Sequence, residues 1–143
     1  MITGQQADDA IRRIVAAMEA ENEHAAIAVV DDHGDLIAAY RMDGSRPRHM
    51  KVAISKAYTA AVRDQSTADF HDELVRRNMQ VASFVDPLFT DTPGGIPVLG
   101  GGKQTIAGIG VTGPTKGHDA RFAAAGIAAF GADATTKDAG TPR

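Results

Sequence analysis

The sequence predicts an α+β sandwich with a single, largely antiparallel sheet. Two pairs of strand-like segments, at residues 25–40 and 94–113, are each joined by a turn too short to contain a crossover helix. Segments with the apolar spacing of helices precede, separate and follow these pairs. Strands paired as hairpins, with helices between the hairpins, are typical of a sheet that packs against helices in layers.

A capped amphipathic helix is predicted near the start of the chain. Thr3 and Gln6 have the spacing of a capping box, in which the Thr3 side chain bonds forward and the Gln6 side chain bonds back. Apolar residues then recur at helical spacing: Ile11, Ile14, Val15 and Met18. The pattern predicts a helix of about five turns.

The first strand pair follows this helix. Residues 25–30 form a continuous apolar run, AAIAVV, which suits a strand covered on both faces. Residues 31–35 supply turn-forming side chains, and residues 36–40 return as the second strand. His33, at the tip of the turn, is interpreted as a solvated turn residue rather than a ligand.

A long helix is predicted to begin near Pro47, because proline is tolerated in the first helical turn. Its expected buried stripe comprises Met50, Ile54, Ala57, Tyr58 and Ala61. On the same helix His49, Lys56 and Arg63 recur every seven residues, so these three side chains share one face.

A further helix is capped by Ser66, and it turns Phe70 and Leu74 to one side. The loop at residues 85–93 is expected to be ordered because it carries apolar side chains. A fifth strand is expected within this loop, near residues 88–90.

The glycine-rich second strand pair is predicted at residues 96–99 and 104–112, with a turn at residues 100–103. Glycine within a strand leaves room for something to approach closely. Two interpretations are open: a ligand lies against the strand, or a helix or neighbouring subunit packs tightly on it.

A last helix is expected from His118 towards Phe130. The residues from Ala132 onward lack an apolar anchor, which predicts a single domain at residues 1–131 and a disordered tail at residues 132–143. The alanine- and glycine-rich composition of the last helix and of the hairpin would suit packing between subunits.

Composition excludes several classes of function. The chain has 43% apolar and 23% charged residues, and its apolar runs are far shorter than the roughly 20 residues that span a bilayer. The absence of cysteine excludes disulfides and thiolate ligands, and with a polar N-terminus it predicts a cytoplasmic protein. A net charge of −3 and few aromatic residues argue against nucleic-acid binding.

Four stretches carry a resemblance to a known family: AIAVVDDHGDLIAAYRMDG, ISKAYTAA, GGIPV, and AGIGVTG followed by HDARFAAAG. The chain resembles the GlcG/HbpS-like haem-binding domain family, which was formerly a domain of unknown function and includes the C-terminal domain of the PduO cobalamin adenosyltransferase. The resemblance implies a profilin-like, three-layer α/β/α sandwich with a five-stranded, mostly antiparallel sheet. It also implies a homo-oligomer, from dimer to octamer. Some family members bind haem, and some lie in catabolic operons.

If haem binds, the iron ligand must come from residues other than cysteine. His49, His71 and His118 are the candidate metal ligands, although a lone histidine on a helix is more often a surface or packing residue. The resemblance also implies a ligand-pocket role for Thr112, because some haem-binding relatives carry a threonine near the last strand.

Lys56 matches the family's KA-x-TA segment and is a candidate for both binding and catalysis. A lysine at the mouth of a pocket can pair with a carboxylate or a haem propionate, or it can form a Schiff base. The other interpretation is a lysine whose stem packs along the helix surface. Arg41 and Arg48 could bind the same anionic partner.

Thr112, Gly113, His118 and Asp119 form the tightest local constellation, where a strand ends and a helix begins. Free N–H groups at a helix N-terminus can hold a carboxylate or phosphate. His118 would act as acid or base together with Lys56 and Asp119, while Gly113 and Thr112 would bind the ligand. For Asp119 the simpler interpretation is a carboxylate that complements the helix dipole.

Two functions follow as expectations. The first is a protein that binds haem, another tetrapyrrole or a related small ligand. The second is a small cofactor-independent catabolic enzyme, an isomerase, tautomerase or hydrolase, acting on an anionic 2-oxo or hydroxy acid at a cleft formed by Lys56, Thr112, His118 and Asp119. Whether the chain is an enzyme stays open, and a structural accessory role is a third possibility.

Overall fold

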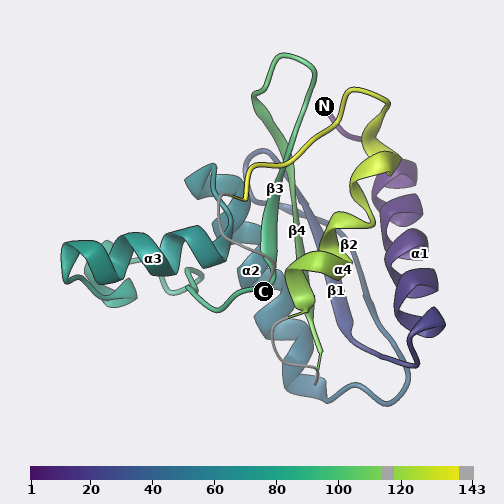
Figure 1. Ribbon diagram of the computed structural model, residues 1–143, viewed down its shortest axis with the longest axis horizontal. Helices are drawn as coiled ribbons and strands as arrows, with labels where there is room; N and C mark the ends of the chain where they lie inside the picture. Colours follow the sequence, from purple (N-terminus) through teal and green to yellow (C-terminus); the bar gives the residue numbers. More distant parts are fainter. Residues whose placement is uncertain (114–117, 139–143) are drawn as a thin grey trace.

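The computed structural model describes residues 1–113 and 118–138 (Figure 1). Four α-helices, four strands and two short 3-10 helices occur in the described residues. In chain order they are α1 (Gly4–Ala20), β1 (Ala26–Asp31), β2 (Leu36–Arg41), α2 (Pro47–Arg63), α3 (Thr67–Arg77), η1 (Val81–Phe84), β3 (Gly95–Leu99), β4 (Thr105–Thr112), α4 (Asp119–Ala124) and η2 (Ile127–Phe130).

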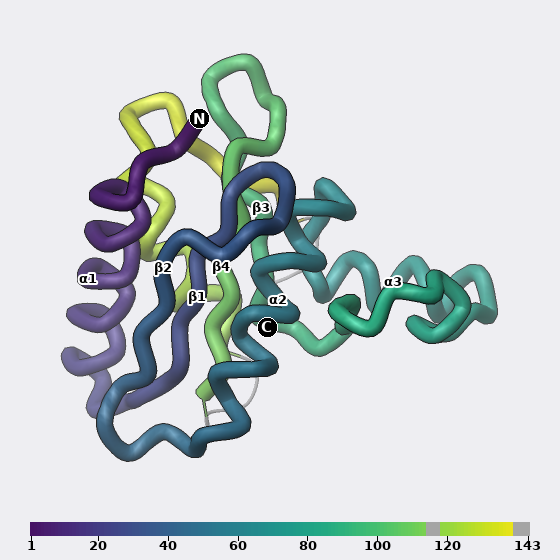
Figure 2. The backbone as a smooth tube through the Cα atoms, turned by 180° about the vertical axis from the view of Figure 1, so that it is seen from behind, coloured from purple at the N-terminus to yellow at the C-terminus, as the bar shows by residue number. Residues whose placement is uncertain are grey.

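The strands form one sheet with the order β2-β1-β4-β3, and every neighbouring pair is antiparallel. Each expected hairpin is present, and the two hairpins join through β1 and β4 in the middle of the sheet. Helices lie on both sides of the sheet, with α1 and α4 on one face and α2 on the other (Figures 1 and 2). The predicted α+β class and the layering of helices on the sheet are therefore confirmed.

The expected fifth strand is wrong for the part of the chain that the structure describes. Bonds within the loop and to α2, not to a neighbouring strand, satisfy the N–H groups of this segment. The Asp86 side chain accepts the Leu88 N–H at 3.0 Å, the Asp86 carbonyl accepts the Phe89 N–H at 3.1 Å, and Thr59 Oγ1 accepts the Thr90 N–H at 3.0 Å. The ring of Phe89 meanwhile packs against Phe70. A loop held by these contacts does not depend on hydrogen bonds to a neighbouring strand, and the described sheet has four strands.

The face of the sheet towards α1 and α4 carries the main hydrophobic core. The capping box at Thr3 and Gln6 is confirmed, and α1 lays its apolar stripe on this face. The predicted last helix breaks in two, because α4 stops at Ala124 and η2 begins at Ile127. Between them Gly126 sits against α1, where a Cβ would come within 2.9 Å of Ile14. This small residue serves packing inside the chain.

The other face of the sheet is covered by α2, which runs along β4 (Figure 2). A Cβ on Gly108 would collide with the Ala57 carbonyl, and one on Gly110 would collide with the Ala53 carbonyl. Of the two interpretations of the glycine-rich strand, close approach of a helix is therefore the one observed at these positions. Glycine here lets the helix backbone touch the strand backbone.

The buried face of α2 matches the predicted stripe in part, because Ala57 and Ala61 are buried as expected. Met50, Ile54 and Tyr58 are only half-buried, whereas the fully enclosed positions are mostly alanines and Lys56. The glycines of β4 explain the difference, because a helix that lies directly on a strand has space only for small side chains at the contact.

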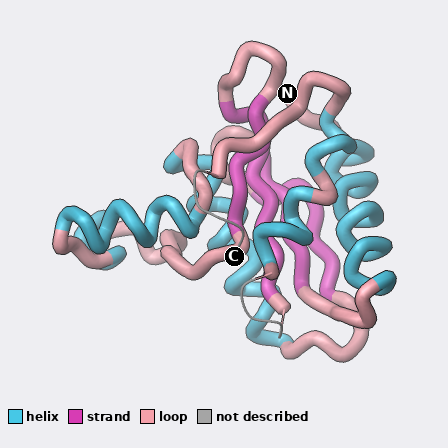
Figure 3. The backbone as a smooth tube through the Cα atoms, in the orientation of Figure 1, coloured by secondary structure: helices cyan, strands magenta, loops and turns pink. Residues whose placement is uncertain are grey.

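Helix α3 projects away from the three layers (Figure 3). Its base is an aromatic cluster in which Phe70, Phe84 and Phe89 pack edge to face at centroid distances of 5.4–6.0 Å. The Arg63 guanidinium lies 4.8 Å from the ring centroids of both Phe70 and Phe84. Arg63 therefore anchors α3, a role that differs from those of His49 and Lys56 on the same helix.

The segment after η2 crosses to the edge of the sheet. Leu99 and Thr135 exchange two backbone hydrogen bonds, and Thr136 Oγ1 donates to the Pro97 carbonyl at 2.6 Å. Ser66 Oγ donates to Asp138 at 2.8 Å. The expectation of disorder from Ala132 onward took no account of these bonds, which hold the chain as far as residue 138. Residues 139–143 of the expected tail lie outside the described residues.

No helix in the described part of the chain is both long enough and apolar enough to span a bilayer.

Candidate functional site

The ammonium group of Lys56 lies where three elements meet. The side chain is 1% exposed, and Nζ donates to the Val111 carbonyl of β4 at 2.8 Å and to Asp119 Oδ2, at the start of α4, at 3.2 Å. The Asp119 side chain is 15% exposed. A lysine placed inward from α2 therefore ties the end of the central strand to the helix that follows it.

Burial shifts both members of this pair towards their neutral forms. Loss of solvation lowers the pKa of Lys56, and the Asp119 carboxylate opposes that shift. Loss of solvation raises the pKa of Asp119. The Lys56 ammonium and a hydrogen bond from the Gly113 backbone oppose this shift. The proton between Lys56 and Asp119 is consequently held less tightly by the amine and more tightly by the carboxylate than in water.

Two consecutive glycines make room for Lys56. Gly94 has a φ of +128°, and a Cβ there would come within 2.7 Å of Lys56 Nζ and 2.9 Å of Asp119 Cβ. A Cβ on Gly95 would collide with the Lys56 carbonyl. The first two residues of the GGIPV stretch are therefore shaped around this lysine, which is a function the sequence analysis did not assign to them.

Three buried polar atoms lack hydrogen-bond partners among the residues that the structure describes, two at the N-terminal end of α2 and one at the end of β4. They are Ser45 Oγ, His49 Nδ1 and Thr112 Oγ1. His49 and Thr112 are each 8% exposed. A buried polar atom without a partner is destabilising by about 1–3 kcal/mol, so such atoms are usually kept for a ligand, an ion or water.

The packing of α2 on β4 indicates how His49 and Thr112 face each other. Gly108 lies under Ala57 and Gly110 lies under Ala53, so two residues of strand match four residues of helix. One further step brings His49 over Thr112, whose side chain shares the face of Gly108 and Gly110 because strand side chains alternate.

Positive charge surrounds His49. Burial lowers the pKa of His49, and Arg48 and Arg46 lower it further, whereas Asp119 opposes the shift. Both arginines are exposed at the start of α2, which has no side-chain cap. The site thus combines an imidazole and a hydroxyl, which can bind a metal ion, with exposed arginines, which can bind the carboxylates of the same ligand.

The remaining predicted residues lie at different distances from this site. Gly113 bonds Asp119 and belongs to the site. Arg41 is exposed in the same row across the sheet as Thr112, with Ala26 between them. His118 precedes α4 and is exposed, so its ring is not part of the buried cluster.

His71 is on α3, where its Nδ1 pairs with Asp91 at 2.7 Å. The three candidate histidines are therefore not brought together, and only His49 lies inside. Ser45, which the sequence analysis did not single out, gave no signal beyond its place before the helix.

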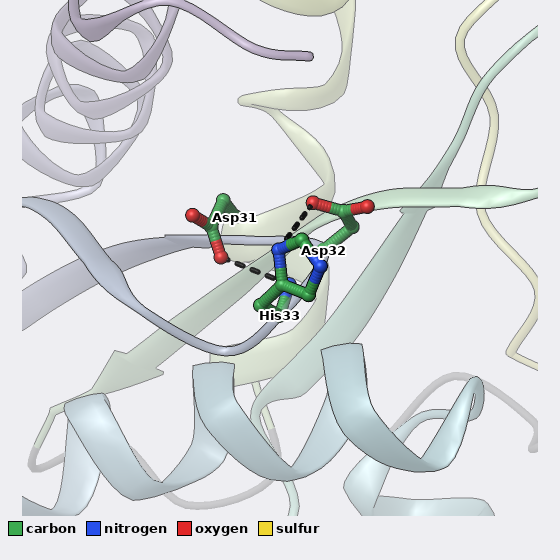
Figure 4. A group of neighbouring side chains, drawn as sticks. All are labelled: Asp31, Asp32 and His33. Atoms are coloured by element: carbon green, nitrogen blue, oxygen red, sulfur yellow. Dashed lines mark hydrogen bonds and ion pairs between the residues drawn. The ribbon is translucent and has the colours of Figure 1, made fainter.

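A second group of candidate ligands lies in the β1–β2 turn (Figure 4). Ligand atoms of Asp31, Asp32 and His33 lie within 4.8 Å of one another. Asp31 Oδ1 already accepts the backbone N–H groups of His33 and Asp35, at 2.9 and 3.0 Å. The grouping is accounted for by turn formation, and it fits the interpretation of His33 as a solvated turn residue.

Known proteins resemble this chain both in sequence and in structure. Residues 2–128 match the family described as haem degrading protein HbpS-like. The protein GlcG of Escherichia coli strain K12 is 38% identical over 103 residues, which cover 69% of this chain and 75% of GlcG.

Solved structures share the fold. A crystal structure of an HbpS double mutant from Streptomyces reticuli has a TM-score of 0.81 and 33% identity, and covers 91% of this chain and 87% of its own. Klebsiella pneumoniae protein ORFY has a TM-score of 0.81 at 23% identity, covering 92% and 91%. A crystal structure of a PduOC–heme complex has a TM-score of 0.79 at 21% identity, covering 90% and 94%. For ORFY and PduOC, at 23% and 21% identity, the similarity is one of fold alone.

Proposed function

Because this chain belongs to the HbpS-like family, we propose that it binds haem or a related tetrapyrrole where the N-terminus of α2 meets the end of β4. The observation that carries the proposal is that Ser45, His49 and Thr112 each hold a buried polar atom without a hydrogen-bond partner among the described residues. The solved heme complex of a protein with the same fold supports it.

The donor set fits this ligand. Burial and the neighbouring arginines lower the pKa of His49 and so favour its neutral form, and a neutral imidazole nitrogen is a ligand for haem iron. Thr112 offers an oxygen beside it, while the exposed Arg46, Arg48 and Arg41 would bind the propionates. Bound iron would supply redox chemistry and a coordination position for a small molecule.

Lys56 and Asp119 would act as positioning residues in this function. Their ion pair joins α2 to the first residue of α4, and Asp119 also accepts the Gly113 N–H. The pair therefore fixes the backbone directly after Thr112, and with it the direction of the Thr112 hydroxyl.

The second candidate, an enzyme acting on an anionic 2-oxo or hydroxy acid, is favoured by the same pair. An amine and a carboxyl group that are both shifted towards neutrality can pass a proton between them, which is what isomerisation or tautomerisation requires. The partly exposed Asp119 would exchange the proton with the substrate, and His118 would exchange it with solvent.

Titration of the purified protein with haemin, followed by absorbance, tests the first candidate. We expect a saturable Soret band, and we expect His49→Ala and Thr112→Val to weaken binding by roughly tenfold or more, as for loss of a buried ligand group. His71→Ala, which removes a histidine paired on α3, is the matched control and should bind as the wild type does.

A flat, unsaturable titration of the wild-type protein would exclude haem binding. Screening of small 2-oxo and hydroxy acids for thermal stabilisation would then test the enzyme, with Asp119→Asn expected to abolish turnover. Binding lost equally in His49→Ala and His71→Ala would place the ligand elsewhere.

A further inference from the structure

The segment that joins β2 to α2, at one end of the sheet (Figure 2), is strongly basic. Residues 41–49 contain three arginines and a single acidic residue, Asp43, and all four of these side chains are exposed. Arg41, Arg46 and Arg48 make no ion pair with any residue that the structure describes. By contrast, five other arginines are each bound to a carboxylate: Arg12, Arg13, Arg63, Arg77 and Arg121. The basic segment therefore has charge available for a partner from outside the chain.

The first turn of α2 adds an unused backbone donor. No side chain caps this helix of 17 residues, and its first residue, Pro47, has no N–H. The Arg48 N–H has no hydrogen-bond acceptor among the described residues. Free N–H groups and the helix dipole make the start of a helix favourable for an anion.

Two buried side-chain atoms at the same turn point independently to a ligand. His49, the third residue of α2, is 8% exposed, and its Nδ1 has no hydrogen-bond partner in the described part of the chain. Because Nδ1 is bonded to the ring carbon nearest the backbone, it stays beside the first turn whichever way the ring is rotated. Ser45, two residues before α2, holds a second buried atom of this kind, its Oγ. An imidazole and a hydroxyl can each donate a hydrogen bond to an anion.

We propose that the first turn of α2 binds a phosphate-type dianion when the protein carries no haem. The arginines and the Arg48 N–H bind its outer oxygens, while Ser45 and His49 donate from below. A tetrahedral dianion offers more acceptor positions than one carboxylate does, and its two charges balance the excess of arginine over aspartate in residues 41–49. The carboxylate of Asp119, whose charge reaches His49, is paired with Lys56 and so repels the anion little.

The anion site shares its arginines with the proposed haem site, where they would bind the propionates. It depends on the proposed function in one respect only, namely that phosphate should compete with haem if haem binds. All of the donors to the anion belong to the chain itself, so the site does not require haem. A failed haem titration and a failed phosphate titration are therefore separate results.

Isothermal titration calorimetry of the haem-free protein with inorganic phosphate tests the proposal, against sodium chloride at the same ionic strength. We expect saturable one-to-one binding to the wild type. Arg46→Gln and Arg48→Gln should each weaken it by roughly tenfold, as for the loss of a charge-assisted hydrogen bond. Arg76→Gln, which removes an exposed arginine of α3, is the matched control and should bind as the wild type does.

Ser45→Ala separates a site at this turn from general attraction to surface charge, because the variant keeps every arginine. We expect it to weaken binding by roughly threefold or more, as for the loss of one neutral hydrogen bond. Glycerol 3-phosphate distinguishes the source of the anion: tighter binding than phosphate assigns a phosphate monoester, and equal or weaker binding assigns the free ion. A wild type that binds phosphate no better than chloride, equal losses in Arg48→Gln and Arg76→Gln, or unchanged binding in Ser45→Ala would overturn the proposal.

Discussion

The two faces of the sheet are built from the same strands and have opposite characters. On the face towards α1, β1 and β4 present Ile27, Val29, Ile109 and Val111 to an apolar core. On the face towards α2, the strands present mostly alanine and glycine, together with Val30 and Thr112, and the covering helix buries His49 and Lys56. Moving one residue along a strand moves from one environment to the other.

The difference separates two tasks. Large aliphatic side chains on the first face remove apolar surface from water, which is the main source of stability in a domain of this size. Small residues on the second face let the α2 backbone touch the sheet, and polar groups are buried there at an energetic cost. The residues of the proposed ligand site therefore lie on the face that contributes less to stability.

The largest expected effect is on the contact between α2 and β4. Gly110→Ala places a methyl group against the Ala53 carbonyl, where neither backbone can yield without moving the helix. We expect a loss of more than about 4 kcal/mol in the free energy of unfolding, or no folded protein. Gly4→Ala, with nothing within 4 Å of the new Cβ, is the matched control and should change stability by under about 1 kcal/mol in urea unfolding.

Next in size is the buried ion pair. Asp119→Leu leaves the Lys56 amine without its charged partner, and we expect a loss of about 3–5 kcal/mol in the free energy of unfolding. Lys56→Met should cost less, because the partly exposed Asp119 can regain water. Equal losses in the two variants, measured by urea unfolding, would show that burial differs less between the partners than the structure indicates.

A conservative change on the apolar face should affect stability alone. Ile109→Val removes one buried methylene from the core, for which we expect a loss of about 1 kcal/mol. Haemin affinity should stay at the wild-type level. If the affinity fell together with stability, the two faces would be energetically coupled and the division of tasks between them would fail.

The smallest expected effect is on the pH dependence of stability, through His49 on the face of the sheet towards α2. Burial lowers the pKa of His49 below its ordinary value of about 6.5 in the folded state, so the unfolded chain binds the proton more readily. The contribution of His49 is present above the unfolded pKa and is lost as the pH falls through the folded pKa. The melting temperature, measured from pH 8 to pH 5, should fall less steeply in His49→Gln than in the wild type.

Local signals in the sequence were sufficient for most of the fold. The capping box at Thr3, the cap at Ser66 and both hairpins depend on residues that are close in the chain, and all are present. The position of α2 depends instead on contacts with β4, about 50 residues further on. For that reason the predicted stripe was right for Ala57 and Ala61 but also named Met50, Ile54 and Tyr58, which are half-buried. It missed the buried Ala53 and Lys56.

The site could be predicted only in part for the same reason. The pattern around Asp119 and Gly113 named residues that do come together, and Lys56 and His49 join them from α2. Their geometry rests on Gly94, whose conformation no local pattern reveals. His71 could not be excluded from sequence because its position depends on how α3 leaves the body of the protein.

The bridge between Leu99 and Thr135 has a consequence for synthesis of the chain. Strand β3 is complete before residues 133–138 are made, and until they emerge its outer backbone groups have no cover from this segment. A nascent chain therefore passes through an interval in which both ends of its sheet can recruit a foreign strand. The interval ends when residues 133–138 dock on β3.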